Sequence, residues 1–152
     1  MPEINLLENY RKSKRNLQER RSLRSPEIQT IARKFGQEFF DGDRIYGYGG
    51  YSYHQRFWQP VIPTFQAHYG LTAKSSVLDV GCAKGFMIHD MAQLIHGITV
   101  KGVDISEYAI ANAIEGQKAN VMVANATSLP FPARIRMSSK TRSRPAGWET
   151  NP

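Results

Sequence analysis

The chain has 152 residues, of which 41% are hydrophobic, and a formal net charge of +7. This length suits one modest domain and excludes two ordinary ones. The sequence has no apolar run long enough to span a membrane and no secretory signal at its N-terminus, and its single cysteine excludes an internal disulfide. We therefore expect a protein of a reducing compartment, cytoplasmic and without a membrane partner.

The positive charge is concentrated at the two ends of the chain. Residues 1–24 and 133–152 each carry a net charge of +4, whereas residues 25–132 carry −1. A basic groove for nucleic acid would place the excess charge within the folded part. We therefore do not expect nucleic acid as the main partner, and binding through the basic termini is kept as a second alternative.

The chain divides into four parts. These are a basic polar N-terminal extension (1–24), a helical pre-domain with a glycine- and tyrosine-rich segment (25–70), a partial cofactor-binding domain (71–132) and a tail (133–152). The pre-domain begins with a helix signal, because Ser25 can cap a helix, Pro26 suits its first position and Glu27 complements its positive end. A second short helix ends at Gly70.

Residues 41–54 form the glycine- and tyrosine-rich segment. One interpretation is a connection whose tyrosines pack on the surface of the domain. The other is a lid over a ligand, because mobile loops with aromatic anchors often close active sites. Both interpretations stay open. The candidates for lid or substrate contacts are Tyr46, Tyr48, Gly49, Tyr51 and Tyr53.

The second half of the chain alternates strands and helices. Strands are predicted at 76–80, 98–104 and 120–124, with Val121 and Val123 facing inward. Helices are predicted at 85–95 and from a cap at Ser106 to a stop at Gly116. This βαβαβ order predicts an α/β fold with parallel strands and right-handed crossovers.

The first strand leads into its helix through the loop Gly81-Cys82-Ala83-Lys84-Gly85. Such a loop opens a cleft at the carboxyl end of a parallel sheet, where nucleotide-like ligands bind. It is not a Walker loop, because Lys84 precedes Gly85, and it lacks the third glycine of a dinucleotide fingerprint. Asp79 would repel a pyrophosphate, but it can orient a cationic amino-acid group through water or backbone contacts.

Polar residues also follow the next two strands. Asp104, nineteen residues beyond Gly85, can accept hydrogen bonds from both hydroxyls of a ribose. Ile105 offers an apolar wall for a purine ring, and Asn125 can contact the adenine edge. The predicted ligand therefore has an adenosine and an amino-acid end but no phosphate, which describes S-adenosylmethionine (SAM).

Three motifs resemble class I SAM-dependent methyltransferases of the bacterial small-molecule type. Residues 77–85 look like motif I of this family, residues 103–106 like its acidic ribose-binding motif, and residues 125–131 like its adenine-contacting loop, which often begins with Asp-Ala. Residues 40–51 are similar to a pre-domain segment of some bacterial members. The resemblance implies SAM as the cofactor, with contacts from Asp79, Gly81, Cys82, Ala83, Gly85, Asp104, Ile105, Asn125 and Ala126.

The resemblance also implies that half of the sheet is missing. The family has seven strands, and we expect the chain to supply only the first three, as the N-terminal half of a Rossmann-like fold. The glycine-loop strand would then lie at an exposed edge. Residues 133–152 show neither strand nor helix periodicity, so we expect a disordered tail or a product of out-of-frame translation.

The leading hypothesis is methyl transfer from SAM to an unidentified small-molecule acceptor, an activity that the truncation would impair. The alternative is a non-catalytic fragment or interaction module that buries its open sheet edge against a partner, and oligomerisation through that edge is one form of this. No catalytic residue is assigned; His54 is a candidate general base, weighed against a structural role. His89 and His96 have no third ligand, so no metal site is expected, and Cys82 is expected to be a small packing residue.

Overall fold

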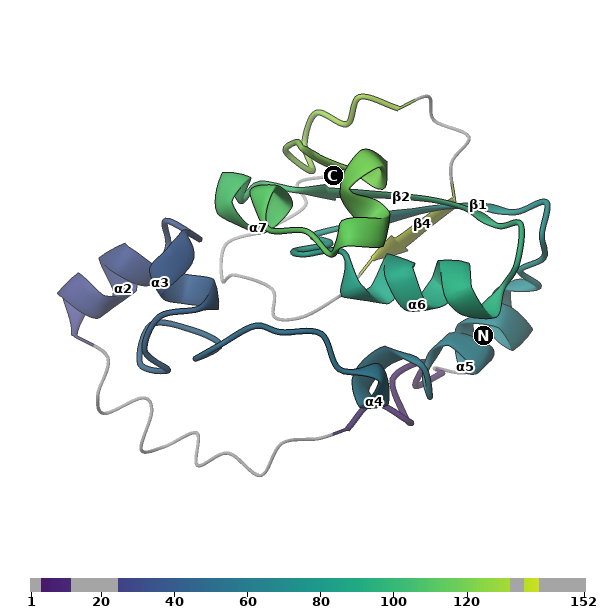
Figure 1. The fold of residues 1–152 in the computed structure, drawn as a ribbon, viewed down its shortest axis with the longest axis horizontal. Helices are drawn as coiled ribbons and strands as arrows, with labels where there is room; N and C mark the ends of the chain where they lie inside the picture. Colours follow the sequence, from purple (N-terminus) through teal and green to yellow (C-terminus); the bar gives the residue numbers. More distant parts are fainter. Residues whose placement is uncertain (1–3, 12–24, 132–135, 140–152) are drawn as a thin grey trace, which may run out of the picture.

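The computed structural model describes residues 4–11, 25–131 and 136–139. Its centre is a parallel sheet with the strand order β3-β2-β1-β4 (Figure 1). The strands are β1 (Ser76–Val80), β2 (Thr99–Asp104), β3 (Val121–Val123) and β4 (Arg136–Ser139). The first three strands alternate with α6 (Phe86–Leu94) and α7 (Glu107–Ala111), which confirms the predicted Rossmann-like βαβαβ unit.

The strand order reverses next to β1, because β2 and β3 lie on one side of it and β4 on the other. In open α/β sheets, ligands bind outside the carboxyl ends of the strands at such a switch point. The expected exposed edge at β1 is therefore wrong, since β4 pairs along Val77–Val80. Oligomerisation of the chain through an open sheet edge stays a prediction.

The strand β4 lies within the tail for which the sequence predicts no regular structure. Strand pairing uses backbone groups, and a neighbouring strand with unpaired N–H and C=O groups accepts a segment of unremarkable sequence. Residues 133–135 and 140–152 of the tail lie outside the described residues. The interpretation as an out-of-frame product stays a prediction.

One face of the sheet is covered by α6, which packs together with α4 (Gln55–Trp58) and α5 (Ile62–Tyr69) of the pre-domain. The helix α6 begins at Phe86, directly after the left-handed Gly85, and buries Met87, Ile88 and Met91 completely. These side chains share a core with Trp58 and Ile62. As predicted, α5 ends at Gly70, which adopts φ +60°.

The other two pre-domain helices are α2 (Pro26–Ala32) and α3 (Gln37–Phe40), which lie at the α7 end of the molecule (Figure 1). The predicted start of α2 is confirmed, since the Ser25 hydroxyl accepts a hydrogen bond from the Ile28 amide at 3.4 Å. No residue of α2 is fully buried, whereas Phe40 of α3 is.

The helix predicted to run from Ser106 to Gly116 ends earlier than its pattern indicates. The helix α7 stops at Ala111, and a 3₁₀ helix, η1 (Glu115–Asn120), follows it. The reason is a long-range contact: the Ile114 amide donates to the Lys84 carbonyl at 2.9 Å, which draws the chain out of the helix toward the glycine loop.

In β3, Val121 faces inward as predicted, but Val123 is 48% exposed. The prediction for Val123 is wrong: a Cβ at Gly85 would lie 3.4 Å from the Val121 side chain, which shows that α6 begins beside Val121, whereas Val123 stays largely exposed.

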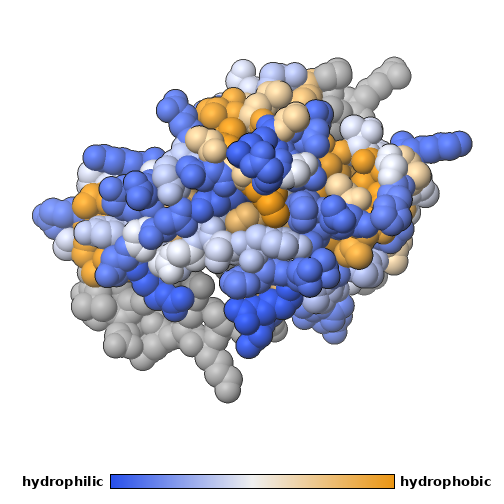
Figure 2. All heavy atoms as spheres, viewed as in Figure 1, coloured by the Kyte–Doolittle hydropathy of each residue, from blue (hydrophilic) through white to orange (hydrophobic). Residues whose placement is uncertain are grey.

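The surface seen in Figure 2 carries its apolar residues in separate patches among hydrophilic ones. None of the helices in the described part of the chain is long and apolar enough to cross a bilayer.

Candidate functional site

The turn after β1 is a tight loop with three left-handed residues. Gly81, Ala83 and Gly85 adopt φ values of +82°, +50° and +76°. The amides of Gly81 and Cys82 both donate to the Val103 carbonyl, at 2.7 and 3.0 Å, which ties the loop to β2. Ala83 adopts this conformation despite its Cβ, so its surroundings must hold it there.

The carboxylate of Asp104 supplies that hold. Its Oδ2 accepts a hydrogen bond from the Ala83 amide at 2.7 Å, and its Oδ1 accepts one from the Ser106 amide at 2.9 Å. Because each carboxylate oxygen has two lone pairs, one acceptor position on each oxygen is left for a ligand. Asp104 is therefore fixed in orientation and still able to accept two hydroxyl protons.

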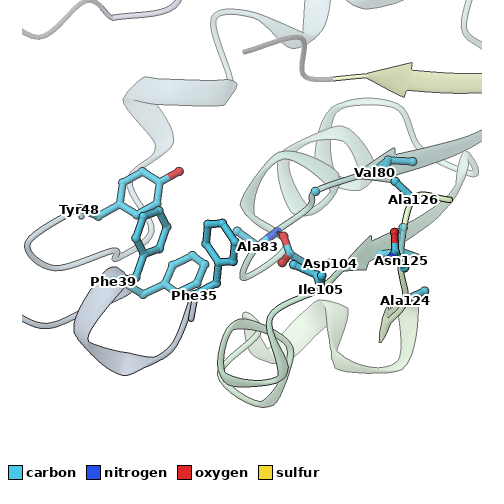
Figure 3. A pocket seen from close by; sticks show the side chains of 13 residues that line it. Phe35, Phe39, Tyr48, Val80, Ala83, Asp104, Ile105, Ala124, Asn125 and Ala126 are labelled. Atoms are coloured by element: carbon cyan, nitrogen blue, oxygen red, sulfur yellow. Dashed lines mark hydrogen bonds between the residues drawn. The ribbon is translucent and has the colours of Figure 1, made fainter. Parts of the chain in front are cut away.

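A cleft of about 410 Å³ lies at this end of the sheet, which is within the usual size range for small-molecule sites. Figure 3 shows Phe35, Phe39 and Tyr48 at one end of the cleft and Asn125 at the other, with Asp104 between them. The full lining comprises Phe35, Phe39, Phe40, Tyr48, Val80, Gly81, Ala83, Val103, Asp104, Ile105, Ala124, Asn125 and Ala126.

Most of the predicted cofactor contacts come together in this cleft. They are Gly81, Ala83, Asp104, Ile105, Asn125 and Ala126, joined by Tyr48 from the predicted lid. Asp79 and Cys82 are fully buried below the lining, and Gly85 lies beside Val121 at the start of α6. Cys82 packs against Gly102, where a Cβ would approach its sulfur to 2.7 Å, and this contact fits the packing role.

The remaining residues of the predicted lid do not line the cleft. Tyr51 and Tyr53 pack against Phe86, with ring centroids 4.9 and 5.7 Å apart. Tyr46 and Gly49 are also absent from the lining. His54 lies away from it, with its ring nitrogen 3.5 Å from the Ser52 hydroxyl, so the structure gives no geometric support to a role as general base.

The aromatic wall of the cleft is the part that sequence reasoning missed. Phe35, Phe39 and Phe40 come from the pre-domain, and their rings contact one another and Tyr48 at centroid distances of 5.1–5.7 Å. Phe35 lies between α2 and α3, and Phe39 and Phe40 lie on the four-residue helix α3, which is too short to show a helical period. The only local signal is the cluster of apolar rings around Gly36.

The electrostatics of the cleft favour a ligand without phosphate. Asp104 is the only charged residue among the described lining residues. Lys84 follows Ala83 directly, but its ammonium group forms an ion pair with Asp41 at 2.6 Å instead of lining the cleft. Burial raises the pKa of the Tyr51 hydroxyl well above its usual value, and nearby Tyr48, Tyr10, Asp79 and Asp104 raise it further. The described lining of the cleft therefore offers a carboxylate acceptor and aromatic faces, but no basic side chain for a phosphate.

The sequence of this region matches a known family. Residues 71–130 match the family model described as a methyltransferase domain. A comparison with curated protein sequences gave no match.

Three solved structures are similar to parts of the chain. The crystal structure of MccD protein is 31% identical, with 46% of this chain and 33% of that chain covered and a TM-score of 0.41. A SAM-dependent methyltransferase from Geobacter sulfurreducens in complex with S-adenosyl-L-homocysteine is 23% identical, with 68% and 37% covered and a TM-score of 0.36. Coclaurine N-methyltransferase bound to N-methylheliamine and SAH is 20% identical, with 78% and 40% covered and a TM-score of 0.43. The chain thus spans well under half the length of these proteins.

Proposed function

We propose that this chain, whose residues 71–130 form part of a methyltransferase domain, binds SAM in the cleft described above and transfers its methyl group to a small-molecule acceptor. The observation that carries the proposal is the Asp104 carboxylate. It stands at the carboxyl end of β2, is fixed by two backbone amides, and shares one cleft with the glycine loop and Asn125. This is the arrangement that a ribose diol requires.

The residues around Asp104 suit the rest of an adenosine. Ile105 is 58% exposed and lines the cleft, so it can cover one face of a purine ring. The Oδ1 atom of Asn125 accepts hydrogen bonds from the amide and hydroxyl of Thr127, both at 3.0 Å. Its Nδ2 group is therefore the part of the side chain that is available to donate to a ring nitrogen.

The opposite side of the glycine loop suits the amino-acid end. A Cβ at Gly81 would meet no atom within 4 Å, so this position leaves open space within the lining. The sulfonium group of SAM is a cation, and a lining with one carboxylate, an aromatic wall and no basic side chain among the described residues would favour it. The fit therefore extends to the charge of the cofactor.

When bound, SAM would supply an activated methyl group for in-line displacement. The protein's task in such a reaction is mainly orientation and exclusion of water. The cleft residues can hold the nucleoside, and the aromatic wall of Phe35, Phe39, Phe40 and Tyr48 can cover it. The role of His54 as a base stays a prediction, and in this proposal the acceptor is an unidentified small molecule.

Titration calorimetry with S-adenosylhomocysteine (SAH) tests the binding step. We expect Asp104→Asn, which keeps the shape of the side chain but removes its charge, to weaken SAH binding about tenfold or more, since it loses charge-assisted hydrogen bonds. Asp43→Asn is the matched control, because Asp43 is an exposed residue that does not line the cleft and whose Oδ1 accepts a hydrogen bond from the nearby Ile45 amide at 2.9 Å.

Equal affinity of the wild-type protein and Asp104→Asn would contradict the assignment of Asp104. Circular dichroism of both variants shows whether the fold is retained, since Asp104 also holds Ala83. Absence of SAH binding by the folded wild-type chain would contradict the proposal as a whole.

A further inference from the structure

The carboxylate of Asp41 joins three segments that are far apart in the sequence. Its Oδ2 atom forms the ion pair with Lys84 of the glycine loop at 2.6 Å and accepts a hydrogen bond from the Tyr108 hydroxyl of α7 at 2.7 Å. Its Oδ1 atom accepts from the Tyr51 amide at 3.0 Å. Asp41 thus fastens the pre-domain to the glycine loop and to α7, in addition to the hydrogen bond from the Ser106 hydroxyl to the Phe35 carbonyl.

We propose that Asp41 is a positioning residue for cofactor binding: through Lys84 it locks residues 35–51 onto the glycine loop and so completes the cleft. This inference rests on the proposed function, and it concerns two residues that are not among the predicted cofactor contacts, Asp41 and Lys84.

Asp41 controls one wall of the cleft. Phe39 and Phe40 come directly before it, and Tyr48 follows seven residues later. The segment is closed on itself, because the Tyr48 amide donates to the Phe39 carbonyl at 2.9 Å and the Gly50 amide donates to the Phe40 carbonyl at 3.1 Å. The aromatic residues therefore move as one unit, and Asp41 attaches that unit to the sheet.

Lys84 connects Asp41 to Asp104 through its neighbour Ala83. The side chain of Lys84 is buried, with 11% of its surface exposed, and its carbonyl accepts from the Ile114 amide at 2.9 Å. A residue held at both its side chain and its backbone restricts its neighbour, Ala83, whose amide donates to Asp104. Loss of the ion pair would therefore loosen the hydrogen bond that orients the Asp104 carboxylate.

Docking of the pre-domain segment and binding of the ligand are thermodynamically coupled. The cleft is complete only when the pre-domain segment is docked, because its lining comes from both parts. A ligand that binds only the complete cleft stabilises the docked form, and docking raises the affinity by the same factor. Binding of the nucleoside and closure of the Asp41–Lys84 ion pair are thus coupled.

The test combines SAH affinity with hydrogen exchange of the pre-domain amides. We expect Asp41→Asn and Lys84→Met each to weaken SAH binding about tenfold, and the double variant to bind no more weakly than the weaker single one, because both remove the same ion pair. Asp41→Glu should recover part of the affinity, and Asp43→Asn should bind like the wild type. Equal affinity of Asp41→Asn and the wild type would overturn the proposal, as would fully additive effects in the double variant.

Hydrogen exchange of the ligand-free protein separates this inference from the proposed function. In Asp41→Asn, the amides of Tyr48, Gly50 and Tyr51 should exchange faster than in the wild type, while the amides of β1 keep their protection. If the wild type does not bind SAH, the proposed function fails, and the exchange result alone then decides whether Asp41 fastens the pre-domain. Unchanged exchange in Asp41→Asn contradicts the attachment itself. If Asp41→Asn does not fold, Tyr108→Phe, which removes one hydrogen bond to the same oxygen, replaces it in both measurements.

Discussion

At the scale of single residues, Asp90 is a buried carboxyl group whose ionisation lowers the stability of the folded state. It lies on α6, fully buried, and its Oδ1 accepts hydrogen bonds from the Tyr53 hydroxyl and from Gln59 Nε2. Its Oδ2 has no hydrogen-bond partner among the described residues. Burial raises the pKa of Asp90 above its ordinary value, although Tyr53, Gln59 and His89 counteract part of the effect. Burial, and to a smaller extent the hydrogen bond to Asp90, raise the pKa of Tyr53 to about 12, so the Tyr53 hydroxyl remains a donor.

A raised carboxylate pKa fixes the sign of a pH dependence. The folded state binds the Asp90 proton more tightly than the unfolded state, so this residue's stabilising contribution is complete below the unfolded pKa of about 3.9 and is lost as pH rises through the folded pKa. We therefore expect the free energy of unfolding of Asp90→Asn, relative to the wild type, to increase as pH is raised from about 4 and then to level off.

Urea unfolding at several pH values between about 4 and 7 measures this difference. The pH dependence of the stabilising contribution of Asp41 has the opposite sign. Burial raises the pKa of Asp41, but the ion pair with Lys84 and the donors Tyr51 and Tyr108 lower it overall. Its contribution is thus lost as pH falls below the usual aspartate range. A pH-independent difference between Asp90→Asn and the wild type would show that Asp90 does not titrate in this interval.

At the scale of elements, Ser106 connects the cleft to the pre-domain. Its hydroxyl caps α7 by accepting from the Ala109 amide at 2.9 Å, and it donates to the Phe35 carbonyl at 2.5 Å. Ser106 is buried. We expect Ser106→Ala to lower the free energy of unfolding by about 1–2 kcal/mol, since it removes a helix cap and the hydrogen bond to the Phe35 carbonyl.

The matched control for this cap is Ser25→Ala. Ser25 caps α2 through a longer hydrogen bond of 3.4 Å, and no residue of α2 is fully buried. Its loss should cost about 0.5 kcal/mol. Urea unfolding of both variants gives the two values, and a larger loss for Ser25→Ala than for Ser106→Ala would contradict the role assigned to Ser106.

Elements defined by local patterns could be predicted, and those defined by distant contacts could not. The apolar run of β1 and the glycines around α6 fixed their positions from sequence alone, and so placed Asp104 and Asn125 at strand ends facing one cleft. The early end of α7 depends on the hydrogen bond from Ile114 to Lys84, thirty residues apart.

The aromatic wall was hidden for the same reason. Phe39 and Phe40 come directly before Asp41, whose carboxylate contacts Lys84 across 43 residues, and no periodicity reports such a pair. The pairing of β4 with β1 likewise depends on backbone groups that no side-chain pattern reveals.

At the scale of the whole molecule, the cleft joins two parts of the chain that contribute unlike chemistry. The sheet supplies backbone-fixed polar groups, with Asp104 at their centre, and the pre-domain supplies aromatic rings. A ligand that contacts both parts resists their separation, so binding should appear as thermal stability. A ligand at a hundredfold its Kd adds about 2.7 kcal/mol to the free energy of unfolding. For a chain of this length we expect SAH at that concentration to raise Tm by about 5–10 °C.

Adenosine and adenosine monophosphate show which part of the cleft provides the stabilisation. Adenosine carries the ribose diol that Asp104 would bind, so it should raise Tm at sufficient concentration. Adenosine monophosphate should do so less well, because the described lining has a carboxylate and no basic side chain to neutralise a phosphate. Scanning calorimetry of the wild type and Asp104→Asn with both ligands measures the four shifts. Equal stabilisation by adenosine and adenosine monophosphate would contradict the charge preference inferred from the lining. A shift with adenosine that persists in Asp104→Asn would place the ribose away from Asp104 and contradict the orientation proposed for the cofactor.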